Sequence, residues 1–195
     1  MVQAALDGAA ELRGVETEVI DLSRLRIEYC LADEACWMKK VPRCLVIKDD
    51  MQELYPKLVE ADGIIIGTPV YYGTVSGRLK VFMDRTTGLG GARALRNKVG
   101  GAIATGGQRH GGQEFAMKTI HNFFLCHSML IVNVMPSGYW GVAGISTFDP
   151  HSIETDRWTC GEENITTLEL AKELGNRIVR LARILRTGSR NAKIG

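Results

Sequence analysis

Short apolar runs alternate with amphipathic segments along most of the chain. Strand-like patterns of continuous or alternating apolar residues occur at residues 15–22, 63–67, 98–104 and 129–135. Apolar residues recur at helical spacing over residues 2–13, 51–61, 77–85, 114–127 and 165–186. Residues 136–164 have neither pattern and are predicted to be irregular. Strands that alternate with helices are typical of a parallel sheet covered on both faces. The pattern therefore predicts an α/β fold, with a doubly wound parallel sheet in a three-layer sandwich.

The order of these elements starts with a helix, whereas a doubly wound sheet normally starts with a strand that becomes central. Without that strand, two neighbouring strands would stand apart and leave buried backbone groups unpaired. We expect that the first strand is missing from the start of the chain; the alternative is that another segment fills its place. Residues 1–195 show no linker or repeat, so we predict a single domain.

Composition excludes some partners. The chain has 195 residues, 45% of them hydrophobic and 24% charged, with a net charge of +2. This mixture is typical of a globular protein and gives no electrostatic reason to bind nucleic acid or an anionic membrane. No apolar run reaches the roughly 18 residues of a membrane span, and no secretion signal is visible. We therefore expect a cytoplasmic protein with reduced thiols and with neither a nucleic-acid nor a membrane partner.

Two glycine-containing loops follow the apolar strands at 63–67 and 98–104, at the edge where open α/β sheets bind ligands. In the first loop, Pro69 stiffens the turn, and Tyr71 and Tyr72 offer flat faces to a planar ring. The second loop contains four glycines, whose backbone N–H donors suit the carbonyl oxygens of a polar heterocycle. Together the loops predict a slot for a flat ring with a polar edge.

Three stretches carry a resemblance to a known family. They read GTPVYYGTVSGRLKVFMDRTTG, GGQRHGGQE and HNFFLCHSMLIV. Together they resemble the flavodoxin-like NAD(P)H-dependent FMN reductase superfamily, in particular its iron–sulfur flavoproteins and the multimeric quinone reductases of the tryptophan-repressor-binding-protein type. The resemblance covers nearly all of residues 2–135. It implies a flavodoxin-like fold that binds FMN non-covalently, with NAD(P)H as the electron donor.

The resemblance also implies which residues surround the flavin. Those that would border the isoalloxazine ring are Thr68, Pro69, Val70, Tyr71, Tyr72 and Gly73. Those that would line its pyrimidine side are Thr105, Gly106, Gly107, Gln108 and Arg109. His127 stands where some quinone reductases have a flavin-site histidine, often supplied across a dimer interface. The family's FMN phosphate loop precedes the first helix, and we expect this sequence to start after it. No catalytic acid or base is expected, because hydride transfer to a flavin needs none from the protein.

Three cysteines, Cys30, Cys36 and Cys44, lie close together in the sequence. Iron–sulfur flavoproteins carry a compact motif of four cysteines at this place, with two-residue gaps between the first three. Here Asp33 stands where the second cysteine would be. A cubane cluster normally takes four thiolates, and a carboxylate is a harder ligand that suits it less well. We therefore predict no bound cluster and no metal site, and this spacing favours zinc no more strongly.

Three functions remain compatible with these observations. The first is an FMN-dependent oxidoreductase that passes electrons from NAD(P)H to a quinone, a flavin or a similar small-molecule acceptor. The alternative is an FMN electron-transfer protein, with or without a cluster, that serves a protein redox partner. The third is a cofactor-free interaction domain. We expect a homodimer or a tetramer, in which the aromatic residues of segment 135–148 complete a neighbour's site; they are Tyr139, Trp140 and Phe148.

The remaining polar residues are predicted to have structural roles. His121 lies on an apolar helix and is expected to pack in the core, whereas His110 is equally compatible with a functional and a solvated role. Asp84 and Arg85 are expected to form a helix-surface or subunit-interface ion pair. The arginines of the last helix are expected on a solvated face; they are Arg177, Arg180, Arg183 and Arg186.

Overall fold

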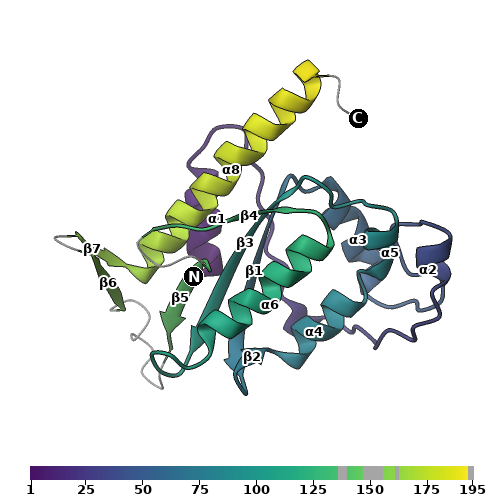
Figure 1. Cartoon of the computed structure of the whole chain (residues 1–195), viewed down its shortest axis with the longest axis horizontal. Helices are drawn as coiled ribbons and strands as arrows, with labels where there is room; N and C mark the ends of the chain where they lie inside the picture. The colour runs from purple at the N-terminus through teal and green to yellow at the C-terminus, as the bar shows by residue number, and fades with distance from the viewer. Residues whose placement is uncertain (136–139, 147–155, 161–162, 193–195) are drawn as a thin grey trace.

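A five-stranded sheet runs through the middle of the computed structural model, which describes residues 1–135, 140–146, 156–160 and 163–192 (Figure 1). Its strands are β1 (Gly63–Tyr71), β2 (Thr74–Val75), β3 (Val99–Gly106), β4 (Leu130–Val132) and β5 (Val142–Ile145). A separate hairpin consists of β6 (Arg157–Cys160) and β7 (Glu163–Thr166). The helical elements are α1 (Val2–Ala10), η1 (Leu22–Arg24), α2 (Ala35–Met38), α3 (Met51–Glu60), α4 (Gly77–Asp84), α5 (Thr87–Gly91), α6 (Gln113–Cys126) and α8 (Thr167–Ala192).

Strand β3 is the centre of the sheet, because strands pair with both of its edges. β1 runs parallel along one edge, with seven residue pairs from Gly63↔Val99 to Pro69↔Thr105. β4 pairs with the first part of the other edge and β5 with the last part, so β4 and β5 together act as one interrupted parallel strand. The prediction that residues 136–164 are irregular is therefore wrong for residues 142–145, 157–160 and 163–164, which lie in strands; residues 165–166 end β7 and do not begin the predicted helix.

Helices cover both faces of this sheet. α6 lies on one face, where Phe124 fills the space above Gly100, and α3, α4 and α5 contribute to the same hydrophobic cluster. α1 and α8 lie on the other face, where Leu174 and Ile178 pack over Gly101. Burial of apolar side chains on both faces is the main term that favours this arrangement. The predicted three-layer α/β sandwich is confirmed (Figure 1).

Helices α1 and α8 approach each other closely through two glycines. A methyl group on Gly8 would overlap the backbone carbonyl of Lys172, and one on Gly175 would overlap the carbonyl of Ala5. Only a residue without a side chain allows two helix backbones to come this near. The four arginines of α8 are all exposed, as predicted; Arg183 donates to the carbonyl of Arg13, and Arg186 pairs with Asp62. Every helix among the described residues is too short or too polar to cross a lipid bilayer.

The predicted strand at residues 15–22 is wrong. These residues form no strand, and a 3-10 turn begins at Leu22. Ile20 and Leu22 do pack against the hydrophobic core, which accounts for the apolar alternation. A strand also needs a neighbouring edge with which to exchange hydrogen bonds. The second edge of β1 is open along residues 63–69, because no described strand pairs with it there.

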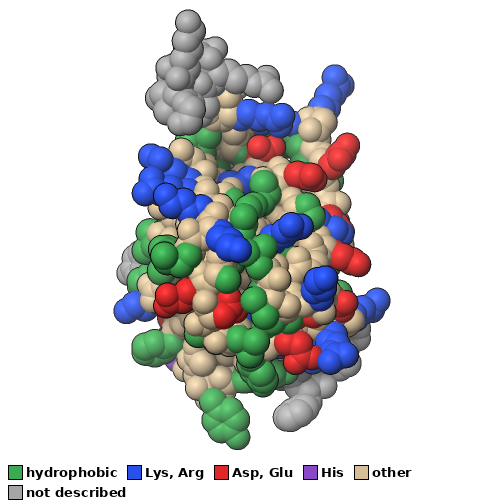
Figure 2. Space-filling view, turned by 90° about the vertical axis from the view of Figure 1, so that its right-hand side faces the viewer, with side chains coloured by type: hydrophobic (Ala, Val, Ile, Leu, Met, Phe, Trp, Pro, Cys, Tyr) green, Lys and Arg blue, Asp and Glu red, His purple; other side chains and the backbone are tan. Residues whose placement is uncertain are grey.

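The segment between η1 and α3 lies at one end of the molecule, beside α5. Trp37 of α2 packs against Gly91 of α5, and the backbone of Val41 passes close to Gly88. On the outer surface of the segment, Leu31 and Met38 are exposed. Figure 2 views the molecule from the side on which α2 and α4 lie and shows hydrophobic side chains exposed among charged ones.

Candidate functional site

The carboxyl ends of β1 and β3 bring the two glycine-containing loops together. The pair Pro69↔Thr105 closes the β1–β3 ladder, so the loops leave the sheet side by side. They touch at Gly112, where an added Cβ atom would lie 2.9 Å from the Cα atom of Gly73 and 3.1 Å from Cγ1 of Val70. Gly112 has a φ of +102°, a conformation that L side chains rarely adopt. A glycine is therefore required where the second loop meets the first.

The first loop is a tight hairpin that presents two aromatic rings. Thr68 is buried, and its Oγ1 accepts a hydrogen bond from the Ser76 N–H at 3.2 Å. This bond fixes the base of the hairpin formed by β1 and β2. At its tip, Tyr71 is 60% exposed and Tyr72 is fully exposed. Neither phenol ring is packed into the protein core, so both have a face available to a planar ligand.

The second loop, residues 106–112, runs between β3 and α6 and is tied to β5 and α8 by side chains. The guanidinium of Arg109 lies 3.4 Å from the carboxylate of Asp156. Asp156 is buried and also accepts hydrogen bonds from the Ile145 N–H and from Thr167 Oγ1. At Gly107 nothing lies within 4 Å of the position of a Cβ atom. The loop thus combines an anchored permanent cation with an accessible stretch of backbone.

His127 lies away from both loops. It follows α6, whose fourteen residues span about 20 Å, whereas the second loop precedes that helix. Its ring is buried, with Nε2 2.9 Å from Oγ1 of Thr86 and an edge against Phe123. Burial lowers the pKa of His127. Within one chain, the structure does not bring His127 to the residues that the resemblance groups with it.

Two further histidines differ in their surroundings, since one of them is packed in the core whereas the other is exposed. His121 is buried, and its ring centroid lies 5.6 Å from that of Trp140, in agreement with the packing role predicted for it. His110 is exposed, with Nδ1 3.7 Å from Glu114. Tyr139 and Phe148 lie outside the described residues.

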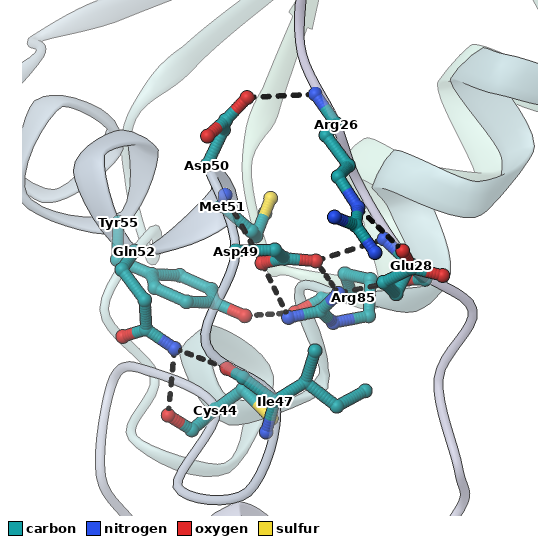
Figure 3. Close-up of polar contacts among 10 residues, drawn as sticks. All are labelled: Arg26, Glu28, Cys44, Ile47, Asp49, Asp50, Met51, Gln52, Tyr55 and Arg85. Atoms are coloured by element: carbon teal, nitrogen blue, oxygen red, sulfur yellow. Dashed lines mark hydrogen bonds and ion pairs between the residues drawn. The ribbon is translucent and has the colours of Figure 1, made fainter.

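Arg85 does not form the surface ion pair expected from the sequence. Asp84 pairs instead with Lys80 at 2.6 Å on the surface of α4. Arg85 points inward, and its guanidinium donates two hydrogen bonds to Asp49, one of them 3.0 Å long (Figure 3). Both side chains are at least 98% buried. The partners are 36 residues apart in sequence, so spacing along one helix gave no signal for this pair.

Around this ion pair, hydrogen bonds fix both ends of the cysteine segment, which we define as residues 28–48. Arg85 donates to the carbonyl of Glu28 at 2.8 Å, and Asp49 accepts from the Glu28 N–H at 2.8 Å. The Tyr55 hydroxyl donates to the carbonyl of Arg85 at 2.8 Å (Figure 3). Burial raises the pKa of Tyr55 to about 12. Burial alone would raise the pKa of Asp49, but the hydrogen bonds from Arg85 and Glu28 outweigh it and lower that pKa.

The thiols within this segment differ in their exposure. Cys30 is exposed, whereas Cys36 and Cys44 are partly buried. Burial of its thiol is the main cause that raises the pKa of Cys36, and the nearby Cys44 raises it further. Sγ of Cys44 accepts a hydrogen bond from the Ile47 N–H at 3.3 Å, and a cavity of about 510 Å³ adjoins it. The carboxylate of Asp33 accepts from the Ala35 N–H at 3.0 Å, at the start of α2.

This arrangement does not match a metal-cluster site. Thiolates are the kind of ligand that iron–sulfur clusters take. Among the described residues, however, no three cysteine, histidine or carboxylate side chains are grouped so that they could hold a metal ion. The carboxylate that replaces the second cysteine of the motif instead accepts a hydrogen bond from the Ala35 N–H. The residues present therefore do not fit a preformed cluster.

The sequence profile of the NADPH-dependent FMN reductase family matches residues 1–145. The chain belongs to this family, which is one of flavin-dependent oxidoreductases. It is 40% identical over 187 residues to an iron–sulfur flavoprotein of Methanocaldococcus jannaschii, covering 95% of this chain and 90% of that protein. It is 33% identical over 179 residues to an NAD(P)H dehydrogenase (quinone) of Geotalea daltonii, covering 88% and 82%.

A solved flavodoxin from the domain Archaea superimposes with a TM-score of 0.53 at 17% identity, over 93% of this chain and 87% of that one. The predicted flavodoxin-like fold is thereby confirmed. In such a fold the carboxyl ends of the parallel strands form the ligand-binding edge, which is where the two loops meet in this chain.

Proposed function

We propose that the protein is an FMN-dependent oxidoreductase that passes electrons from NAD(P)H to a quinone, a flavin or a similar acceptor. The observation that supports this most strongly is the contact of the two loops at Gly112, with exposed aromatic rings on one loop and accessible backbone on the other. Bound FMN would supply the redox chemistry, because its ring accepts a hydride and passes electrons on.

The protein's own residues would bind and orient the ring. Tyr71 and Tyr72 have exposed faces suited to stacking against it. The backbone at Gly107, which no side chain covers, would donate hydrogen bonds to its polar edge. Arg109 would place a permanent positive charge beside the pyrimidine side, which favours the reduced, electron-rich form.

The first prediction concerns the two tyrosines. We expect the double substitution Tyr71→Ala and Tyr72→Ala to weaken FMN binding about 5- to 150-fold, because each stacked ring contributes about 0.5–1.5 kcal/mol. FMN titration followed by flavin fluorescence measures the change. NADPH oxidation with a quinone, measured on the same samples, tests the reaction.

Tyr29→Ala is the matched control, because Tyr29 is also an exposed tyrosine, at 75%, but lies in the cysteine segment. Its FMN affinity should equal that of the wild type. If the unaltered protein binds no FMN, or if the double variant binds it as tightly as the wild type, the proposed site is wrong.

A second candidate function is electron transfer to a protein redox partner. The observation in its favour is the exposed apolar surface of the cysteine segment, where Leu31, Trp37 and Met38 are all at least half exposed. Exposed apolar patches are typical of protein interaction sites. Steady NADPH oxidation with a small quinone supports the first function, whereas turnover that requires a reduced ferredoxin supports the second.

We propose, further, that the protein assembles as a homodimer or a tetramer. Tyr71, Tyr72 and Phe115 are exposed on or beside the two loops, and a neighbouring subunit would cover this apolar surface. Size-exclusion chromatography with light scattering should give a mass of two or four chains. A monomer that carries a full complement of flavin would contradict a shared site.

A further inference from the structure

Gln113 is a buried polar residue at the start of α6, directly after the second loop. Only 3% of its surface is exposed. Gly112, which precedes it, has no side chain with which to cap the helix. Buried amides in proteins almost always have hydrogen-bond partners for both polar atoms. Gln113 satisfies only one of them.

The amide of Gln113 joins the second loop to the sheet. Its Nε2 donates to the carbonyl of Gln108 at 2.8 Å and to the carbonyl of Gly144 at 3.3 Å. Both acceptors are carbonyl oxygens, so the NH₂ group must face them. Oε1 then points elsewhere and has no donor among the described residues. One side chain thus connects the second loop to β5.

Two of the glycines in the second loop are explained by close contacts, one with this side chain and one with the Gln108 carbonyl to which it donates. A Cβ atom on Gly106 would lie 2.7 Å from Nε2 of Gln113. A Cβ atom on Gly111 would lie 3.4 Å from Oε1 and 2.8 Å from the carbonyl oxygen of Gln108. Only Gly107, at which a Cβ atom would meet nothing, leaves open space toward a ligand. Gly106 therefore accommodates the amide of Gln113, and Gly111 accommodates the Gln108 carbonyl to which that amide donates.

We propose that Gln113 is a positioning residue, which holds the second loop so that its backbone meets the polar edge of the flavin ring. This inference rests on the proposed function and adds a residue to its site. Gln113 acts through Gln108 and not by touching the ring, because its polar atoms are buried beneath the loop. If the bound ring shifts the loop so that one of its backbone N–H groups moves toward Oε1, this atom gains the hydrogen-bond donor that it lacks. Ligand binding and the hydrogen bonding of Gln113 are then coupled.

Two substitutions test this role. Gln113→Met keeps the length of the side chain and removes both polar atoms, whereas Gln113→Glu keeps an acceptor and removes the NH₂ donor. We expect the Kd for FMN to rise about tenfold or more in both variants. We also expect the reduction potential of the flavin that still binds to move away from the wild-type value, because its polar edge is held differently.

Gln52→Met is the matched control. Nε2 of Gln52 also donates to two backbone carbonyls, those of Cys44 at 3.1 Å and Ile47 at 2.7 Å, but in the cysteine segment. This variant should lose a similar amount of thermal stability while keeping the wild-type Kd and potential. Gly106→Ala, which displaces the Gln113 amide, should behave like Gln113→Met.

The outcomes separate the inference from the function on which it rests. If wild-type protein binds no FMN, the proposed function fails and this inference fails with it. If wild-type protein binds FMN and Gln113→Glu binds it equally well at an unchanged potential, the inference alone is wrong. It is also wrong if Gln52→Met weakens binding as much as the Gln113 variants do, because the effect would then be one of general stability. If Gln113→Met does not fold, Gln113→Glu decides.

Discussion

Replacing Arg85 with leucine is expected to destabilise the protein by about 3–5 kcal/mol, because Asp49 would be left as a buried and unpaired charge. The same substitution removes the hydrogen bond to the carbonyl of Glu28, which holds one end of the cysteine segment. Urea unfolding followed by circular dichroism measures the loss. The double variant Arg85→Leu with Asp49→Leu should recover part of it, because two apolar side chains leave no charge uncompensated, whereas the hydrogen bonds to the backbone of Glu28 stay lost.

The pH dependence of stability gives an independent check on this pair. The folded state lowers the pKa of Asp49, so its ionised form stabilises the protein above the unfolded pKa of about 3.9. This contribution should be lost as the pH falls through the lower, folded pKa.

Lys80→Met, which breaks the exposed pair with Asp84, should cost less than about 1 kcal/mol. Equal losses for the buried and the exposed pair would contradict the account.

Asp33→Cys is expected to convert the cysteine segment into a cluster-binding site. The substitution supplies a fourth thiolate at the two-residue spacing that iron–sulfur flavoproteins use, and cluster binding then orders the ligands. After anaerobic reconstitution with iron and sulfide, we expect about four iron atoms per chain in the variant and only traces in the wild type. Iron and acid-labile sulfide assays measure both.

Glu34→Cys is the matched control, since it adds a thiol one residue away from the motif position. It should bind no more iron than the wild type. Wild-type protein that reconstitutes to the same iron content as Asp33→Cys would show that three cysteines are sufficient, and the prediction of no cluster would be wrong.

The parts of the fold that the sequence predicts are those in which local pattern and tertiary environment agree. The cores of β1 and β3 are continuous apolar runs, because helices bury both faces of the sheet. The segment 15–22 has an equally good alternating pattern but pairs with no described strand, although one edge of β1 is open. An alternating pattern of apolar residues indicates which side chains are buried. Formation of a strand also depends on hydrogen bonds to the edge of another strand, which can lie far away in the sequence.

The candidate site likewise has parts that the sequence predicts and parts that it does not. Composition alone locates the two loops, because glycine and tyrosine after apolar strands are a local signal. The role of Gln113 depends on carbonyls of Gln108 and Gly144, and that of Arg85 on a carboxylate contributed by another segment. Neither relation follows from spacing.

The bonding of β3 has a mechanical consequence for the loop that follows it. β3 is hydrogen-bonded to β1 along one edge and to β4 and β5 along the other. Local opening is easiest where few backbone bonds must break, and here bonds on both sides of the strand would have to break. The glycine loop is therefore mounted on a rigid support, so that its backbone N–H groups are held in place before a guest molecule arrives.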